Sequence, residues 1–351
     1  MAIESRFAAC GDYAPREVVE YRGVVLPAYF AQPTQEYQVA RRTAALFDRS
    51  DRAILILTGK DRSDWLHNLV TNEVKRLAAG SGCYAFAVDV RGRTQFDVNI
   101  LALPDDLWLD LDAAAYEAAR AHLERYLISE DVQLVDARRR FARLGCVGPR
   151  AREIAAQLGV VDFDALPALA HRALAEGAAR VVRHDFAGLP GFELIAPREQ
   201  AAAWWSRAVR ELGVQPAGQR TLDVLRIEAG IPWLGRDIDD KVIPPETGQV
   251  ERGISYRKGC YLGQEVIERM RAHGSVARRL ARLSTADGSG LELPAMLRKE
   301  GQEAGRITSL VRHPREPRWI GLGYVRTKLT DLTGLTAGDP PREIAIESGA
   351  A

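Results

Sequence analysis

Cysteine is scarce in this chain of 351 residues, and its distribution excludes several kinds of site. The four cysteines are Cys10, Cys83, Cys146 and Cys260, and no two of them form a CxxC pair. Their spacing excludes a zinc knuckle and a ferredoxin-type cluster motif, and the six histidines show no ligand spacing either, so we expect no metal site. Sparse, unpaired cysteines are typical of a reducing compartment, which favours a cytoplasmic protein.

Net charge and long apolar runs are also lacking. The formal net charge is +1 at pH 7, which argues against a general binder of nucleic acid or of membrane surfaces. We therefore expect neither as a direct partner. The apolar run at residues 53–57 has the length of a strand and is far too short for a membrane span. Glu4, Arg6 and Asp12 interrupt the N-terminal segment, so we expect no secretory signal there.

Patterns of helix and strand alternate over the first 136 residues. We expect helices over residues 33–48, 63–70 and 113–127, and strands over residues 52–58, 84–88, 94–103 and 132–136. A glycine turn at residues 89–93 joins two of these strands. From residue 52 onward the order is strand, helix, strand, strand, helix, strand, which matches a ferredoxin-like unit.

The rest of the chain divides into two parts. Residues 141–215 repeat a related alternation, with strands over 141–147, 179–185 and 191–196 and helices over 150–158 and 199–212. Short strands over 280–283, 303–310, 320–325 and 342–346 then predict a small β-barrel or sandwich. We expect two domains, residues 1–270 and residues 275–351, with the change near Ser275 and frayed residues from Glu347 onward.

The segment KGCYLGQE, residues 258–265, places a thiol between glycines and beside a lysine. A helix is expected over residues 264–270, with Gly274 as its stop signal. The positive end of that helix and the charge of Lys258 both favour the thiolate form of Cys260. Cys260 is therefore a candidate nucleophile or metal ligand. The alternative is a small buried residue in a tight turn.

Two carboxylates are further candidates. Asp97 lies early on an otherwise apolar strand, where a carboxylate needs a partner or a function. Glu228 lies in the segment RIEAG, which begins at Arg226. The alternatives are a hydrogen-bonded residue at the start of a strand for Asp97, and a solvated helix face with Arg226 as its neighbour for Glu228.

KGCYLGQE resembles the signature of the YgfZ family, folate-binding relatives of the glycine-cleavage T-protein that support iron–sulfur enzymes. Residues 21–27 and 45–50 resemble the opening of that family, and residues 237–246 lead into the cysteine motif. The resemblance covers nearly the whole chain. It implies an α+β protein with the GcvT-like fold: ferredoxin-like and related α/β subdomains around a central folate pocket, followed by a small C-terminal β-barrel.

The resemblance also implies roles for individual residues. Asp97 matches the T-protein aspartate that interacts with folate and takes part in one-carbon transfer, and Phe96 replaces the acidic neighbour often found there. Glu228 matches a glutamate that holds the pterin ring, whose 2-aminopyrimidinone edge offers two parallel N–H donors to a carboxylate. The implied cofactor-binding residues are Asp97, Glu228, Arg226, Tyr261 and Gln264, and the implied catalytic residues are Asp97, Cys260 and Lys258.

The implied function is that of a tetrahydrofolate-binding protein of the YgfZ type, which assists assembly or repair of iron–sulfur enzymes such as tRNA-modifying ones. Its cofactor is tetrahydrofolate or a one-carbon-substituted folate. Its expected partners are iron–sulfur assembly factors or iron–sulfur client enzymes. Two alternatives stay open: a folate-dependent aminomethyltransferase or demethylase that uses Asp97, with Cys260 incidental, and a non-catalytic module that docks partners.

Overall fold

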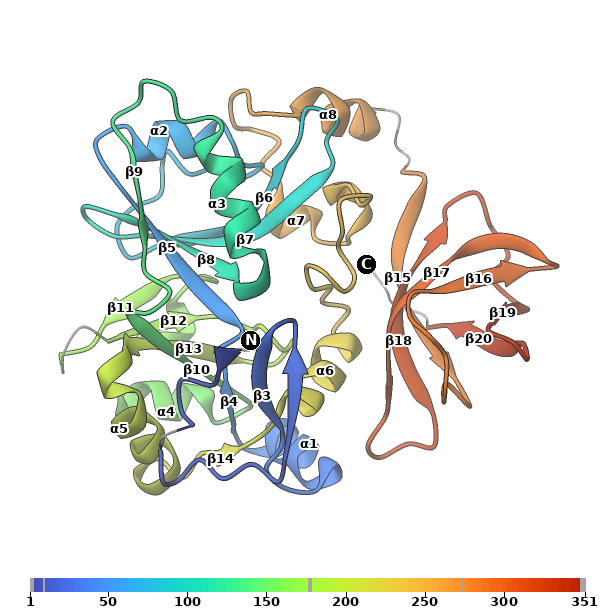
Figure 1. Ribbon diagram of the computed structural model, residues 1–351, viewed down its shortest axis with the longest axis horizontal. Helices are drawn as coiled ribbons and strands as arrows, with labels where there is room; N and C mark the ends of the chain where they lie inside the picture. Colours follow the sequence, from blue (N-terminus) through green and yellow to red (C-terminus); the bar gives the residue numbers. More distant parts are fainter. Residues whose placement is uncertain (1–2, 9, 176–178, 273, 275, 348–351) are drawn as a thin grey trace.

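Three sheets and a closed barrel make up the protein. The computed structural model describes residues 3–8, 10–175, 179–272, 274 and 276–347. Figure 1 shows the two larger sheets stacked one above the other, with the barrel beside them and α6 and α7 between. The helices are α1 Pro33–Arg42, α2 Arg62–His67, α3 Tyr116–Glu124, α4 Ala151–Gln157, α5 Ala201–Ser206, α6 Gln219–Glu228, α7 Val250–Gly253 and α8 Gln264–Ala272.

The strands follow four pairing orders. The five-stranded sheet, β6-β7-β8-β5-β9, contains β5 Arg52–Thr58, β6 Gly82–Val88, β7 Thr94–Ala102, β8 Leu107–Asp112 and β9 Gln133–Asp136. The six-stranded sheet, β11-β12-β13-β10-β4-β14, contains β4 Ala45–Asp48, β10 Phe141–Val147, β11 His171–Ala173, β12 Arg180–Arg183, β13 Gly191–Pro197 and β14 Gln215–Pro216. A small sheet, β1-β3-β2, contains β1 Ile3–Glu4, β2 Glu17–Tyr21 and β3 Val24–Tyr29.

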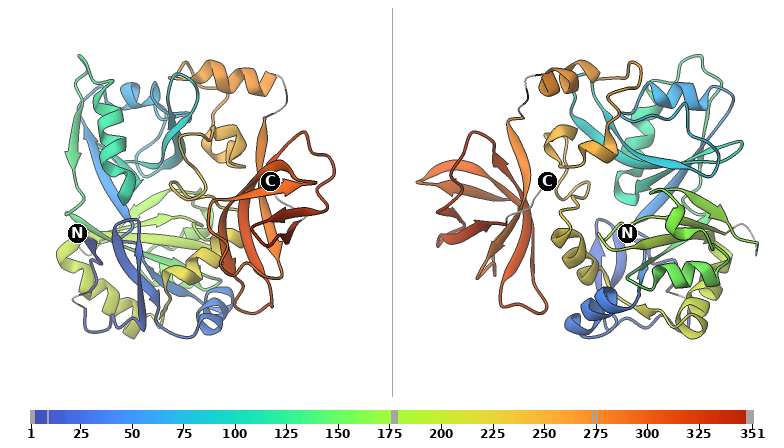
Figure 2. Two further views of the ribbon diagram at one scale, coloured as in Figure 1. Left: turned by 45° about the vertical axis from the view of Figure 1, so that its right-hand side comes forward. Right: turned by 180° about the vertical axis from the view of Figure 1, so that it is seen from behind.

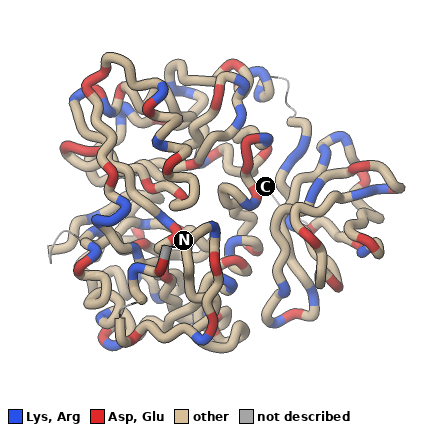
Figure 3. The backbone as a smooth tube through the Cα atoms, viewed as in Figure 1, with Lys and Arg blue, Asp and Glu red and all other residues tan. Residues whose placement is uncertain are grey.

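The barrel closes in the order β15-β18-β17-β16-β19-β20. Its strands are β15 Arg278–Thr285, β16 Ala295–Lys299, β17 Gln302–Arg312, β18 Trp319–Arg326, β19 Leu335–Ala337 and β20 Arg342–Ile346. Figure 2 shows the barrel standing apart from the sheets, with α6 on the side that faces it. Within the described residues, no helix is long and apolar enough to cross a membrane. Positive and negative residues are interspersed along the chain (Figure 3), and their numbers are nearly equal.

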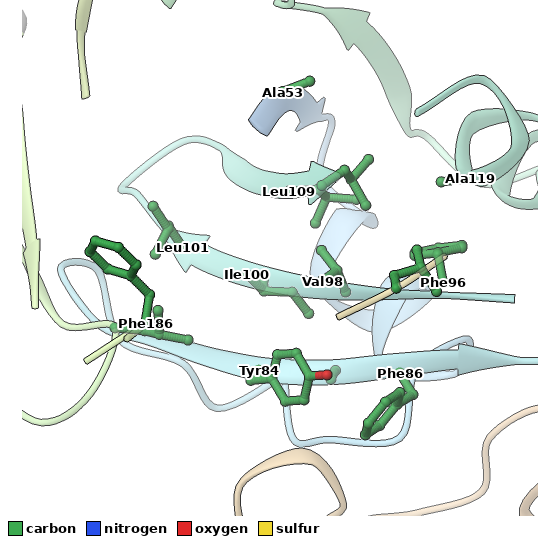
Figure 4. Close-up of a cluster of buried hydrophobic side chains, with 14 of the residues drawn as sticks. Ala53, Tyr84, Phe86, Phe96, Val98, Ile100, Leu101, Leu109, Ala119 and Phe186 are labelled. Carbon is green, nitrogen blue, oxygen red and sulfur yellow. The ribbon is translucent and has the colours of Figure 1, made fainter. Parts of the chain in front are cut away.

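The alternation of side chains along β7 gives the five-stranded sheet two different faces. Phe96, Val98 and Ile100 are buried on one side of the strand, and the ring of Phe96 contacts the ring of His122 on α3. Figure 4 shows these residues beside the neighbouring strand β6. Asp97 lies on the opposite side, because successive residues of a strand point to opposite faces. The polar side of β7 therefore faces away from α3.

A seam of buried ion pairs joins the two larger sheets. Arg143 on β10 pairs with Asp110 on β8 and with Glu193 on β13, where its Nη2 atom lies 2.6 Å from Oε2. Arg49 also pairs with Glu193, at 3.0 Å. Burial alone would raise the pKa of Glu193, but the positive charges of Arg143 and Arg49 outweigh it and hold that pKa well below its usual range. The two sheets are thus held together by charges that solvent does not reach.

The expected fold class is confirmed: a mixed α/β fold with a closed C-terminal β-barrel, whose strands run from Arg278 to Ile346. Strands β5, β10 and β20 have the expected bounds, and the strands expected near residues 84, 94 and 191 form β6, β7 and β13. The expected boundary at Ser275 lies outside the described residues, as do His273 and the residues after Glu347.

Two expectations from the sequence were wrong in part. The helix expected over residues 33–48 ends at Arg42, and Ala45–Asp48 forms strand β4, because all four of its residues are buried between β10 and β14. The strand β8 was not expected, since Asp110 and Asp112 give its sequence a polar character. Arginines neutralise both aspartates, so the ferredoxin-like order gains a fifth strand in its sheet. Strands β16 and β19 of the barrel were also missed.

The seam predicts an unequal response to the loss of two arginines. Arg143→Met should lower the free energy of unfolding by about 3–5 kcal/mol, because it leaves the buried carboxylates of Asp110 and Glu193 short of a partner. Arg138→Met is the matched control: Arg138 and its partner Asp136 are about one-third exposed, and such pairs contribute at most about 1 kcal/mol. Urea unfolding of the three proteins at pH 7 measures both losses. Similar losses would contradict a structural role for the seam.

Candidate functional site

Asp97 is a buried carboxylate that is only half satisfied. It lies on β7 opposite Phe86 of β6, and its Oδ2 atom accepts a hydrogen bond of 2.8 Å from the Tyr84 hydroxyl. Its Oδ1 atom is buried and has no hydrogen-bond partner among the described residues. A buried oxygen without a partner is costly, so it requires an explanation such as a ligand.

The surroundings of Asp97 are made by β6 and α7. Tyr84 and Phe86 lie on the same side of β6 as Asp97 does on β7, since they pair across the strands. The guanidinium of Arg252, on α7, lies 4.1 Å from the centre of the Tyr84 ring. Helix α7 approaches so closely that a Cβ on Gly253 would lie 2.7 Å from the Phe86 ring. Residues from the sheet and from the much later helix α7 therefore enclose this carboxylate.

The cysteine motif packs against the turn that leads into β7. A Cβ on Gly263, whose φ is +77°, would lie 2.3 Å from the carbonyl oxygen of Asp89, so only glycine fits. A Cβ on Gly92, in the same turn as Asp89, would lie 3.0 Å from the Val266 side chain on α8. The structure thus brings two segments that the sequence singled out, residues 89–93 and 258–265, into direct contact.

Within this motif the thiol and the ammonium differ in exposure. Cys260 is exposed and forms no disulfide, which is contrary to the alternative of a small buried residue. Lys258 is buried, with 7% of its surface exposed. Its Nζ atom donates to the carbonyl oxygens of His67 and of Val70, the latter at 2.6 Å. Burial lowers the pKa of Lys258 to about 8. The ammonium of Lys258 therefore stabilises the end of α2 and the loop that follows it.

Tyr261 and Gln264 have different positions in the motif. Tyr261 is buried, with its ring 4.9 Å from Lys258 Nζ, and its hydroxyl has no hydrogen-bond partner among the described residues. Gln264 is the first residue of α8 and is partly exposed. The expected helix after Cys260 is confirmed, with its end at Ala272.

Glu228 is a second half-satisfied carboxylate, at the C-terminal end of α6. Its Oε1 atom accepts a hydrogen bond of 2.8 Å from the hydroxyl of Tyr37 on α1. The same atom lies 3.0 Å from Nε2 of His313, in the loop between β17 and β18. Its Oε2 atom is buried without a partner among the described residues. Glu228 borders a cavity of about 290 Å³, and Arg41, Arg282 and Arg318 line the same cavity.

Arg226 does not border that cavity. It is completely buried, and its guanidinium pairs with Asp223 at 2.9 Å and with Asp237 at 2.7 Å. Its Nη2 atom donates to the Ser309 hydroxyl on β17. The guanidinium joins α6 to the barrel, which is a structural role that its place beside Glu228 in the sequence does not reveal.

The predicted site residues fall into three groups in the structure. Lys258, Cys260, Tyr261 and Gln264 lie in one segment, and the turn before Asp97 contacts Gly263 of that segment and Val266 of α8. Asp97 has partners from β6, while Glu228 has partners from α1 and the barrel, so the two carboxylates have no partner in common. Tyr37, Tyr84 and His313 were missed as site residues. His313 is 85 positions from Glu228, and nothing in its local sequence indicates the contact.

Comparisons with known proteins agree with this fold. The family model described as GCVT N-terminal domain matches residues 14–256. An aminomethyltransferase of Geobacillus kaustophilus is 30% identical over 339 residues, which cover 93% of this chain and 90% of that protein. An aminomethyltransferase of Rubrobacter xylanophilus is also 30% identical, over 88% of this chain and 83% of that protein. The glycine cleavage system aminomethyltransferase T of Bartonella henselae has the same fold, with a TM-score of 0.81, 19% identity, and coverage of 95% of this chain and 93% of that one.

The exposure of the four cysteines predicts their order of alkylation. Cys260 should react with iodoacetamide first, because it is exposed, whereas burial raises the pKa of the Cys83 and Cys146 thiols to about 12. Cys10 is buried as well. Peptide mapping after short labelling at pH 7.5 measures the order, with Cys260→Ser as the control that should lose the fast reaction. Labelling of Cys83 or Cys146 at the rate of Cys260 would contradict the assignment.

The buried ammonium of Lys258 predicts a dependence of stability on pH. Its pKa is about 8 in the folded protein and 10.5 ordinarily, so between these values the unfolded chain binds more protons and stability rises with pH. Lys258→Met should lack this rise, which amounts to about 3 kcal/mol. Urea unfolding at pH 7.5 and pH 10 measures it, with exposed Lys60→Met as the control that should behave like the parent protein. Equal pH dependence in both variants would refute the buried charge.

Proposed function

The chain belongs to the family of the GCVT N-terminal domain, and we propose that it binds tetrahydrofolate, or a one-carbon-substituted folate, and acts in one-carbon transfer of the aminomethyltransferase type. The relatives at 30% identity bear the name aminomethyltransferase. They support the type of reaction, and the two half-satisfied carboxylates support the cofactor.

The observation that carries the proposal is that Asp97 and Glu228 each have one carboxylate oxygen with a partner and one without. In each carboxylate one oxygen accepts from a tyrosine hydroxyl, and the other is buried without a partner among the described residues. A pterin ring has N–H donors on the edge of its 2-aminopyrimidinone, and donors of this kind would satisfy such oxygens. The residues present therefore fit the cofactor. The cavity at Glu228, about 290 Å³, is at the lower limit of small-molecule sites and suits a ring system better than the full length of a folate.

Each carboxylate is prepared for a ligand by its neighbours. Tyr84 fixes the orientation of Asp97, and α7 with Arg252 excludes water from it, which strengthens any hydrogen bond to Oδ1. Tyr37 and His313 fix Glu228 in the same way. The folate, when bound, supplies the nitrogen that carries the one-carbon unit. We assign Asp97 to the reacting end and Glu228 to recognition of the ring, and Tyr261 and Gln264 to the wall beside the turn at residues 89–93.

A second candidate function rests on Cys260. Its thiol is exposed on a loop that Gly263 holds against the turn before β7. True aminomethyltransferases do not use a cysteine at this position, so the thiol favours the YgfZ type of function, in which the protein supports assembly or repair of iron–sulfur enzymes. Iron–sulfur assembly factors or client enzymes would then be its partners, and Lys258 would position the loop that presents the thiol.

Folate binding is tested by substitution at the two carboxylates. Glu228→Ala should weaken tetrahydrofolate binding at least about tenfold, because loss of a buried charge-assisted hydrogen bond costs on the order of 2 kcal/mol. Asp97→Asn should weaken it as well, since an amide is a poorer acceptor than a carboxylate. Calorimetry measures both affinities, with exposed Glu251→Ala as the control. An affinity for tetrahydrofolate that is unchanged in both variants would contradict the proposed folate site.

The two candidate functions predict different outcomes in a second experiment. Aminomethyl transfer requires activity in a glycine-cleavage assay with tetrahydrofolate, which Asp97→Asn abolishes and Cys260→Ser leaves intact. The YgfZ type requires that deletion of the gene lowers iron–sulfur-dependent tRNA thiolation, and that the Cys260→Ser gene fails to restore it. Folate binding without either activity would leave the non-catalytic alternative as the function.

A further inference from the structure

A long groove lies along the junction of α6 with the barrel, next to His313, the partner of Glu228. One cavity of about 630 Å³ and another of about 480 Å³ share Tyr29, Arg220, Val224 and Arg312 in their linings, so they are continuous. Residues of α6 and β3 line one wall of the groove, and residues of β17 line the other. Exposed Leu293 and the partly exposed Trp319 give it apolar surface.

The barrel wall of this groove is the open edge of a strand. The pairing of β16 with β17 ends at Ala295 and Ile307, and residues 309–312 of β17 pair only with β18. Pro294, the next residue before β16, has no N–H to continue the ladder. All five residues 308–312 line the 630 Å³ cavity. Because successive side chains of a strand point to opposite faces, five consecutive residues can border one cavity only along the backbone edge.

The groove also has donors and positive charge that lack partners. Gln219 is 3% exposed, borders the cavity from α6, and its Nε2 atom has no hydrogen-bond partner among the described residues. Arg312 and Arg315 are exposed, and neither side chain forms an ion pair within the part of the chain that the structure describes. Arg220 and Arg236 add two more positive charges, each paired with one carboxylate residue. These four arginines outnumber the two carboxylates of the lining, Asp223 and Glu316, so the groove is complementary to negative charge.

We propose that this groove binds an extended acidic peptide of a partner protein, which adds to the free edge of β17 as a further strand. Backbone hydrogen bonds to residues 308–312 would hold a segment of about five residues, which spans roughly 17 Å. Carboxylates of the peptide would pair with Arg312 and Arg315, and the amide of Gln219 would donate to a peptide oxygen. An exposed strand edge is usually covered or blunted, and a partner strand covers it here.

The test uses the full chain and a fluorescein-labelled synthetic peptide in which valine alternates with glutamate over seven residues. Fluorescence anisotropy should show saturable binding of this peptide and at least tenfold weaker binding of the same peptide with lysine in place of glutamate. The double variant Arg312→Glu, Arg315→Glu should bind the acidic peptide with at least tenfold lower affinity, and it should bind the lysine peptide more tightly than the parent protein does. The control is Arg125→Glu, Arg139→Glu, which changes two exposed arginines on the five-stranded sheet side.

A second probe separates strand addition from attraction between charges alone. N-methylation of alternate peptide amides leaves the peptide charge unchanged and removes backbone donors, so it should weaken binding at least tenfold. Hydrogen exchange at residues 308–312 should slow when the acidic peptide is bound. The absence of saturable binding, or binding that the arginine reversal does not change, would overturn the proposal. Binding that N-methylation leaves intact would overturn it equally, because the peptide would then dock without joining β17.

Discussion

The ion pair between Arg226 and Asp237 fixes the relation of the sheets to the barrel. Both residues are completely buried, and their side-chain atoms lie 2.7 Å apart. Burial alone would lower the pKa of Arg226, but the charges of Asp237 and Asp223 outweigh it and raise that pKa. Thr308 and Ser309 of β17 donate to the other oxygen of Asp237. Since a buried charge that loses its partner is costly, α6 cannot move away from β17, and Glu228 at the end of α6 keeps its place beside the barrel.

Four carboxylates with buried oxygen atoms fall into two classes, according to whether one or both oxygens have a partner. Glu193 and Asp237 each have partners on both oxygens, and they join elements that are distant in the sequence. Asp97 and Glu228 each retain one buried oxygen without a partner among the described residues. The first class serves the fold, because every partner is already present. The second class has an oxygen that can still accept a hydrogen bond, and this difference distinguishes the candidate site residues from structural ones more sharply than burial does.

Local patterns in the sequence predicted the helices, turns and strands that neighbouring residues determine. The helix after Cys260, the glycine turn at residues 89–93 and strands such as β5 follow from neighbouring residues. The strand β8 and the roles of Arg226 and Tyr37 do not. The local sequence of Asp110 is that of a surface residue, and its burial depends on ion pairs with Arg52 and Arg143 from other strands. The hydroxyl that donates to Glu228 belongs to a residue 191 positions away. Prediction from the sequence therefore fails for charged residues that are buried by partners distant in the sequence, and the candidate site contains several of them.

The thiol of Cys260 is exposed and the carboxylate of Asp97 is buried, yet the turn between β6 and β7 connects the two segments that hold them. Asp97 gains strength as an acceptor when water is excluded, whereas Cys260 must be reached from solvent to react. The turn at residues 89–93 begins the strand that holds Asp97, and its backbone touches Gly263 of the cysteine motif. A displacement at one of these positions must therefore shift the other. The contact of Gly263 with Asp89 therefore holds the exposed thiol of Cys260 and the buried carboxylate of Asp97 in one framework.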